Sequence, residues 1–84
     1  MKTVTVYNLK GGEDNVAGTI TWDGSQLTAK GMPFVERMPA SPVFDAFSGQ
    51  QVTSDEQPER WLGLLHTQYN SAYLRASKPV EQKE

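Results

Sequence analysis

The sequence predicts an α+β fold in which a small antiparallel sheet of three to four strands packs against one long C-terminal amphipathic helix. Two observations carry this prediction. Apolar and polar residues alternate along the N-terminal part of the chain, as in half-buried strands. Residues 54–78 instead carry apolar side chains at helical spacing. We expect a single small domain over residues 1–84, with a frayed tail at about 80–84.

The first predicted strand spans residues 2–9, which are rich in β-branched and aromatic side chains. Val4 and Val6 lie on one face of this strand, and Tyr7 lies on the other. Residues 10–15 contain two glycines followed by acidic and amide side chains, which favour a turn. A second strand is expected at residues 16–22, where alternation resumes. One of its faces carries Val16, Gly18, Ile20 and Trp22.

The dipeptide Asp23-Gly24 is a strong hairpin signal, because both residues tolerate positive φ. A two-residue loop places Ile20 opposite Leu27, whereas a four-residue loop places Trp22 opposite Leu27. Both registers leave these three apolar side chains on the same face of the sheet. We therefore predict Ile20, Trp22 and Leu27 as core residues.

The segment 31–54 is predicted to be irregular, because three prolines interrupt any long element. One helical turn is expected between Pro33 and Pro39, with Pro33 at its start. Residues 50–53 form a candidate short fourth strand. We expect this crossover to lay three phenylalanines over the sheet edge, namely Phe34, Phe44 and Phe47.

The predicted helix over residues 54–78 begins at Ser54, which has the properties of an N-cap residue. Gln57 stands three residues later and completes a capping box. Pro79 ends the helix. An apolar stripe is expected to face the sheet, formed by Trp61, Leu62, Leu65, Tyr69, Ala72, Tyr73 and Ala76.

The chain offers few groups that carry catalysis. It has one histidine, His66, and no cysteine. The glycine pair at residues 11–12 lacks the lysine and hydroxyl residue of a phosphate-binding loop, and the adjacent acids do not have the spacing of a calcium loop. We therefore expect no cofactor, no metal site and no catalytic residue. A small enzyme built around His66 is the least favoured of three functional hypotheses, because His66 needs a partner that no sequence spacing supplies.

The first functional hypothesis is a small non-enzymatic interaction or regulatory module. The outer face of the predicted helix carries two leucines that the core stripe does not use, Leu64 and Leu74. Basic and hydroxyl side chains surround them, as at the rim of a protein interface. We predict that this face binds a protein partner or a second copy of the chain. The candidate residues are Arg60, Leu64, Thr67, Ser71, Leu74, Arg75 and Lys78.

Nucleic acid is the alternative partner for the same face. Arg60, Arg75 and Lys78 would contact phosphates, and Tyr7 on the outward face of the first strand would offer a stacking platform. Three basic residues give only weak, salt-sensitive binding. The formal net charge of -2 also argues against a general attraction to phosphate backbones.

The chain shows no signal-like N-terminus and no apolar run long enough to cross a bilayer. Together with the absence of cysteine, this leads us to expect a soluble cytoplasmic protein that does not enter a membrane.

Overall fold

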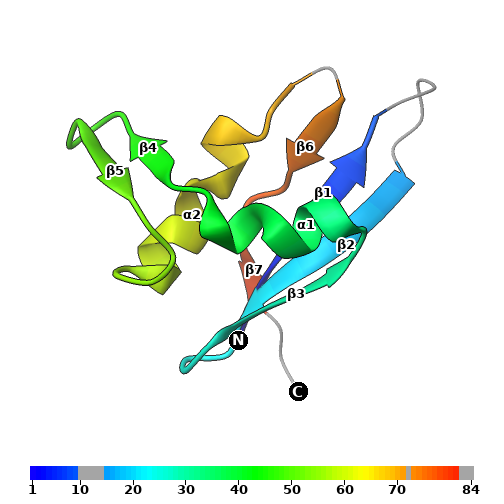
Figure 1. The fold of residues 1–84 in the computed structure, drawn as a ribbon, viewed down its shortest axis with the longest axis horizontal. Helices are drawn as coiled ribbons and strands as arrows, with labels where there is room; N and C mark the ends of the chain where they lie inside the picture. Colours follow the sequence, from blue (N-terminus) through cyan, green and yellow to red (C-terminus); the bar gives the residue numbers. More distant parts are fainter. Residues whose placement is uncertain (10–14, 72, 82–84) are drawn as a thin grey trace.

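The computed structural model describes residues 1–9, 15–71 and 73–81. These residues form a compact α+β fold of short helices and antiparallel strands (Figure 1). The elements in chain order are β1 (Lys2–Asn8), β2 (Asn15–Trp22), β3 (Leu27–Gly31), α1 (Pro33–Arg37), the 3₁₀ helix η2 (Met38–Ala40), β4 (Val43–Asp45), β5 (Gln50–Val52), α2 (Pro58–Gln68), β6 (Leu74–Ala76) and β7 (Val80–Glu81).

Five of the described strands form one sheet in the order β3-β2-β1-β6, and β7 also pairs with β1. The two strands predicted at residues 2–9 and 16–22 are confirmed as β1 and β2. The β2–β3 hairpin adopts the four-residue-loop register, with Trp22 opposite Leu27 and Ile20 opposite Ala29. Asp23 closes this loop, because its Oδ1 atom accepts the backbone N–H groups of Ser25 (2.7 Å) and Gln26 (2.8 Å). The predicted turn at residues 10–15 lies almost entirely outside the described residues.

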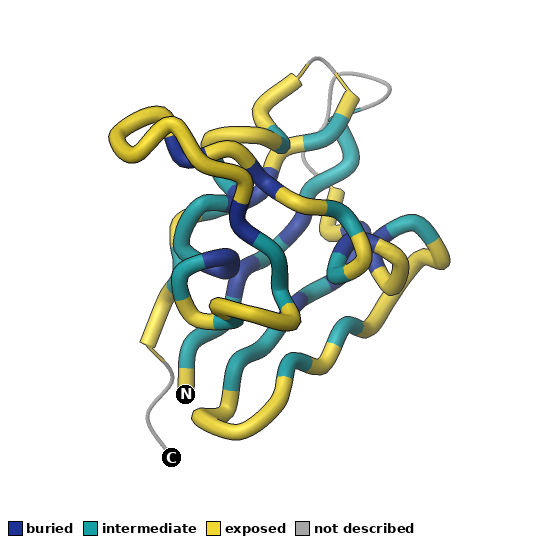
Figure 2. The backbone as a smooth tube through the Cα atoms, turned by 60° about the vertical axis from the view of Figure 1, so that its left-hand side comes forward, coloured by how far each residue is buried: buried dark blue, intermediate teal, exposed yellow. Residues whose placement is uncertain are grey.

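The two faces of the sheet differ in composition. Val4, Val6 and Ile20 are fully buried on the face that packs against the helices (Figure 2). Trp22 and Leu27 share that face but are only half-buried at its end, so their assignment as full core residues was too strong. We call the opposite face the threonine face, which is formed by Thr3, Thr5, Thr19, Thr21 and Thr28.

A register shift in the β1–β2 ladder changes which side chain of β2 points inward. Val6 pairs with Gly18, but Tyr7 pairs with Val16, so Ala17 is the extra residue of a bulge. Ala17 is buried, and Val16 is 65% exposed. The expectation that Val16 faces the core is therefore wrong, because simple alternation does not continue through a bulge.

The prediction of one long helix over residues 54–78 is also wrong. Helix α2 spans Pro58–Gln68 and has 11 residues. Ser54 does not cap it, because its hydroxyl donates to the carbonyl of Pro39. Two other residues, Thr53 and Glu56, bond to each other in this region. The Glu56 N–H donates to the Thr53 hydroxyl (3.2 Å), and this hydroxyl donates to the Glu56 carboxylate (3.1 Å). This pairing stabilises a turn that precedes the helix.

The C-terminal end of α2 shows why the apolar pattern does not continue as a helix. Ser71 Oγ accepts the N–H groups of Tyr73 (3.2 Å) and Leu74 (3.1 Å), a local alternative to helical bonding. Residues Leu74–Ala76 then pair with β1 as strand β6. Ala76 is buried there, but Tyr73 is 72% exposed and so leaves the predicted core stripe. Ala72 lies outside the described residues.

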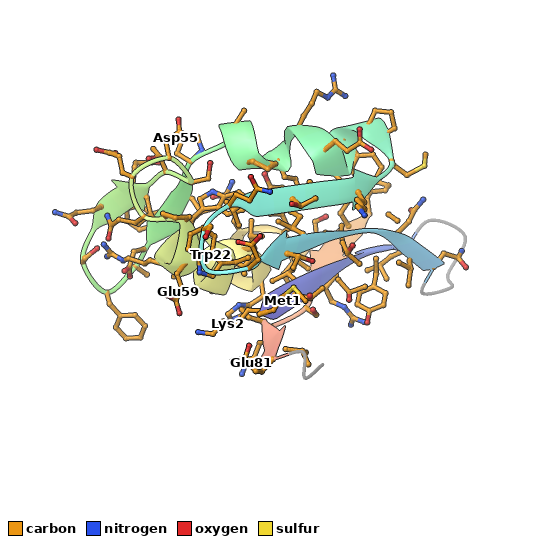
Figure 3. The ribbon with its side chains drawn as sticks, turned by 90° about the horizontal axis from the view of Figure 1, so that it is seen from below. Met1, Lys2, Trp22, Asp55, Glu59 and Glu81 are labelled. Carbon is orange, nitrogen blue, oxygen red and sulfur yellow. The ribbon has the colours of Figure 1, made fainter. Side chains whose placement is uncertain are left out.

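The predicted frayed tail is ordered at its start, since Val80–Glu81 forms β7 against β1. Two ion pairs lie at this end of the sheet (Figure 3). Lys2 Nζ approaches Glu59 of α2 at 2.7 Å, and the amino group of Met1 approaches Glu81 at 3.1 Å. The hydrogen bond between Lys2 and Glu59 raises the pKa of Lys2 and lowers the pKa of Glu59. Residues 82–84 lie outside the described part of the chain.

The middle segment confirms some expectations and contradicts others. Helix α1 is the predicted helical turn and carries Pro33 at its first position. The strand expected at residues 50–53 is β5, but it pairs with β4 in a separate two-stranded sheet rather than joining the main sheet. Phe34 is half-buried and packs against the core. Phe44 is half-exposed and Phe47 is fully exposed, so they do not cover the sheet edge.

Candidate functional site

The seven residues predicted to bind a partner do not share one helix face. Arg60, Leu64 and Thr67 belong to α2, whereas Leu74 and Arg75 belong to β6. Ser71 lies in the turn between these elements, and Lys78 follows β6. Leu64 and Leu74 are half-buried and pack against the core, which gives both leucines a structural role. Because α2 ends at Gln68, the prediction that these seven residues share the outer face of one helix is wrong. Partner binding by these residues stays a prediction.

The three basic residues proposed for nucleic acid lie in different environments. The Arg60 guanidinium forms an ion pair with Asp45. The Arg75 guanidinium lies 5.4 Å from the centre of the Tyr7 ring, in cation–π geometry over the proposed stacking platform. Lys78 is exposed beyond β6. Nucleic-acid binding by this set stays a prediction, and the structure does not unite the three residues in one stripe.

His66, the residue of the enzyme hypothesis, lies on helix α2. Its Nδ1 atom is buried and has no hydrogen-bond partner in the described residues. A catalytic histidine is normally oriented by a carboxylate or carbonyl at this nitrogen. No three histidine, aspartate or glutamate side chains of the described residues gather as a metal site. None of the helices in the described segments has the length and apolar character needed to cross a membrane.

An open hollow lies over the threonine face. It has a volume of about 570 Å³ and is lined by Met1, Thr3, Thr5, Thr19, Thr21, Asp23, Thr28 and Lys30. Threonine hydroxyls need an adjacent base to become nucleophiles. His66 is not among the lining residues. The hollow therefore does not combine a nucleophile with a histidine base.

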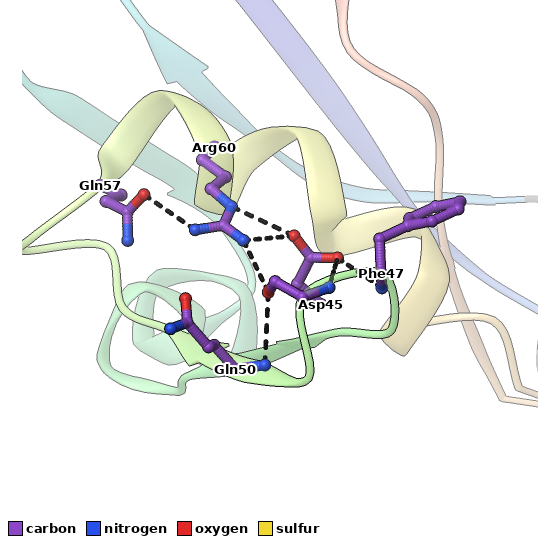
Figure 4. A network of polar contacts seen from close by, with 6 residues as sticks. Asp45, Phe47, Gln50, Gln57 and Arg60 are labelled. Carbon is purple, nitrogen blue, oxygen red and sulfur yellow. Dashed lines mark hydrogen bonds and ion pairs between the residues drawn. The ribbon is translucent and has the colours of Figure 1, made fainter.

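A network of side-chain hydrogen bonds joins the β4–β5 hairpin to helix α2 (Figure 4). Asp45 is 8% exposed, although it is charged. Its Oδ1 atom accepts the N–H of Phe47 (2.9 Å) and that of Ser48 (3.4 Å), while its Oδ2 atom accepts the Arg60 Nε–H (3.2 Å). The bond from Arg60, followed by that from the Phe47 N–H, lowers the pKa of Asp45 below its ordinary 3.8.

Arg60 connects this hairpin to helix α2. Besides Asp45, its guanidinium donates to Gln57 Oε1 (3.0 Å) and to Ser48 Oγ (2.8 Å). Ser48 Oγ also accepts the Gln50 N–H (3.3 Å). These bonds fix both sides of the hairpin tip against α2. We refer to the arrangement of Asp45, Ser48 and Arg60 as the hairpin clamp.

Gly49 completes the tip. It has φ +72, and its N–H donates to the Asp45 carbonyl (2.8 Å). The clamped tip presents Phe47, whose ring points away from the clamp (Figure 4) and is fully exposed at 102%. Single exposed apolar side chains are common on folded domains, but an aromatic ring held out on a hydrogen-bonded tip has the form of an interface anchor.

Comparisons with known protein families, curated proteins and solved structures found no match. The candidate site is therefore described from the contacts of this chain alone.

Sequence reasoning missed this site, because it laid Phe44 and Phe47 over the sheet edge and assigned Arg60 to a partner-binding helix face. One local signal was present. In the segment Asp45-Ala46-Phe47-Ser48-Gly49, an aspartate precedes a serine and a glycine, which is typical of an aspartate-closed turn. A turn of this kind projects its central side chain outward. The contact with Arg60 has no such signal, because the two residues are far apart in the sequence.

Acid should remove the contribution of the hairpin clamp to stability. Because the pKa of Asp45 is lowered on folding, its contribution is present above about pH 4 and is lost as pH falls through the lower folded value. We expect Asp45→Asn to have a lower melting temperature than the wild type at neutral pH. This difference should shrink as pH falls from about 4 toward about 2.

Thermal unfolding followed by circular dichroism across this pH range measures the effect. Asp55→Asn is the matched control, because Asp55 is an exposed aspartate outside the clamp. It should follow the wild type at every pH. A constant difference between the wild type and Asp45→Asn from neutral pH to about pH 2 would contradict this role of the carboxylate.

Proposed function

We propose that this chain is a non-enzymatic protein-interaction module that inserts Phe47 into an apolar pocket of a protein partner. The observation that supports it is the full exposure of Phe47 on a tip that the hairpin clamp holds in place. Interfaces commonly depend on a few aromatic anchors that fill pockets of the partner. A tip that is ordered before binding loses less conformational entropy on association.

Replacing Phe47 should abolish most of the binding without unfolding the domain. We expect Phe47→Ser to weaken the complex about thirtyfold or more, as loss of an anchor worth about 2 kcal/mol does. Its free energy of unfolding should change by less than about 0.5 kcal/mol, since an exposed side chain buries no area. A photo-crosslinking residue at position 47 identifies the partner in extracts of the source organism, and calorimetry with the purified partner measures the affinity.

Two further variants separate an anchor from general surface stickiness. Val16→Ser removes an apolar side chain that is 65% exposed on β2, and it should leave the affinity unchanged. Asp45→Asn keeps Phe47 but loosens the tip, and it should weaken binding less than Phe47→Ser does. Equal affinity of Phe47→Ser and wild type would contradict the proposal, and so would equal losses in Phe47→Ser and Val16→Ser.

A further inference from the structure

A second surface feature of this chain has the size of one aromatic ring. It is a pocket of about 140 Å³, which we call the α1–β6 pocket. Apolar cavities of about 150 Å³ hold a benzene ring. The pocket includes Leu74, one of the residues that the sequence predicted to bind a partner. The residues that line it are Phe34, Arg37, Met38, Ser41, Tyr69 and Leu74.

The side chains of this pocket are of the kinds that bind aromatic rings. Phe34 and Tyr69 are half-buried and provide aromatic surface for ring pairing. Met38 is buried and contributes a thioether, which packs well against aromatic rings. Arg37 is exposed and contributes a guanidinium, which is attracted to the face of a ring. An aromatic side chain therefore suits the pocket in chemistry as well as in size.

Two other hollows of the described residues do not suit a ring. The hollow beside Lys2 has a similar volume, about 150 Å³, but three carboxylates line it. They belong to Asp23, Glu59 and Glu81. The hollow over the threonine face, at about 570 Å³, is several times larger than a ring. The α1–β6 pocket alone among these three combines ring size with an aromatic and aliphatic lining.

We propose that the α1–β6 pocket of one copy of this chain receives Phe47 of a second copy. This inference rests on the proposed function, in which Phe47 is an anchor that needs an apolar pocket, and it names the partner. Phe47 is fully exposed, so it does not occupy the pocket of its own chain. Each copy offers one ring and one pocket of matching size. Two copies therefore supply both sides of the contact without a third component.

Charge and buried area set the strength of this contact. Residues 46–50 around Phe47 carry no charged side chain, and Asp45 is paired with Arg60. The tip therefore brings no net charge to the Arg37 guanidinium at the pocket. A buried phenylalanine contributes about 150–250 Å², so two reciprocal contacts and the pocket surface they cover bury roughly 600–1,000 Å². This area lies below that of stable interfaces, so we expect a dissociation constant between about 10 μM and about 1 mM.

Sedimentation velocity of the purified chain measures the association. The sedimentation coefficient of the wild type should rise with concentration over this range. Phe47→Ser removes the ring, and Ser41→Phe fills the pocket of its own chain with a ring. Each variant should weaken self-association about thirtyfold or more, as loss of an anchor does.

A mixture of these two variants tests the contact itself. The Phe47→Ser chain keeps an open pocket, and the Ser41→Phe chain keeps its Phe47. The two variants together should therefore form a 1:1 complex, although each alone stays monomeric. A general loss of surface apolarity would not produce this recovery.

Arg37→Ala provides a second pocket variant that does not add a large side chain. It should weaken self-association about two- to fivefold, because it removes only the cation–π contribution. Glu36→Ala is the matched control, since Glu36 is also exposed on α1 but does not line the pocket. Circular dichroism of each variant verifies the fold.

Photochemical crosslinking locates the contact. A photo-crosslinking residue at position 47 of the purified chain should join two chains and attach to the pocket, at Met38 or Tyr69. The proposal would be overturned by a wild type that stays monomeric up to about 1 mM, by wild-type association of Phe47→Ser or Ser41→Phe, or by a mixture that stays monomeric.

One pair of results separates this inference from the proposed function. A monomeric wild type whose position 47 crosslinks to a different protein in extracts overturns the self-association and leaves the proposed function standing. A chain that neither self-associates nor crosslinks at position 47 contradicts both.

Discussion

Replacing Trp61 with alanine should cost about 3–5 kcal/mol of folding stability, a large part of the total for a domain of this size. Trp61 is fully buried at the centre of the core. Its indole Nε1–H donates to the Ser41 carbonyl (2.8 Å) and so ties α2 to the segment before β4. The variant loses the packing area and leaves this carbonyl without its donor. Urea unfolding followed by far-ultraviolet circular dichroism measures the loss.

Two controls make this result specific. Trp61→Phe keeps most of the apolar area but removes the indole donor, so it should cost less than Trp61→Ala. Tyr73→Ala replaces another aromatic residue of the apolar stripe that the sequence predicted. Because Tyr73 is 72% exposed, this variant should cost less than about 0.5 kcal/mol. A large cost for Tyr73→Ala, or an unchanged midpoint for Trp61→Ala, would contradict the core described above.

Gly31→Ala should destabilise the domain by at least about 3 kcal/mol. Gly31 has φ +129 and lies opposite Gly18 in the β2–β3 ladder. A Cβ atom at position 31 would lie 2.4 Å from the Ala17 carbonyl oxygen and 2.5 Å from Gly18 Cα. Both are backbone atoms, which have no rotamer to change. The substitution therefore adds a steric clash to an unfavourable backbone conformation.

Gly24→Ala separates these two costs. Gly24 also has positive φ, +100, but a Cβ atom there would meet no atom within 4 Å. We expect only the conformational cost, about 1–2 kcal/mol. Chemical denaturation of both variants gives the comparison. If Gly31→Ala costs no more than Gly24→Ala, β2 and β3 separate easily at this position, and the close approach of the two glycines does not contribute to stability.

Local patterns were sufficient to predict β1, β2 and the hairpin that leads into β3, but they left two registers of that hairpin open, of which the structure has the four-residue-loop register. Val4, Val6 and Ile20 alternate with threonines, and the Asp23 side chain closes its turn within three residues. Each of these signals acts between sequence neighbours. The bulge at Ala17 has no such signal, because it arises from how β1 and β2 fit together.

The end of α2 was not predictable from apolar spacing alone. Leu74 and Ala76 fit both a helical stripe and an alternating strand. The choice depends on β1, whose second edge needs backbone partners that residues 74–76 supply. This requirement is non-local. The predicted helix therefore ran through a segment that tertiary pairing turned into β6.

The candidate site at the β4–β5 hairpin was not predicted, for a related reason. Apolar composition predicted that Phe47 covers the sheet edge, but Phe47 lies in the turn closed by Asp45 and is fully exposed. Arg60 was assigned to a partner surface because the predicted helix places it opposite the apolar stripe. The structure shows that its partner is Asp45, from a separate two-stranded sheet.

The position of β1 has a consequence for the order of folding. This strand comes first in the chain, yet one of its edges is completed only by β6 and β7, which come near the end of the described residues. Contacts so far apart in sequence form late and slow the folding of small domains. During synthesis, β1, β2 and β3 are made long before the strands that close that edge. A nascent chain therefore carries an open sheet on both sides until residues 74–81 have left the ribosome.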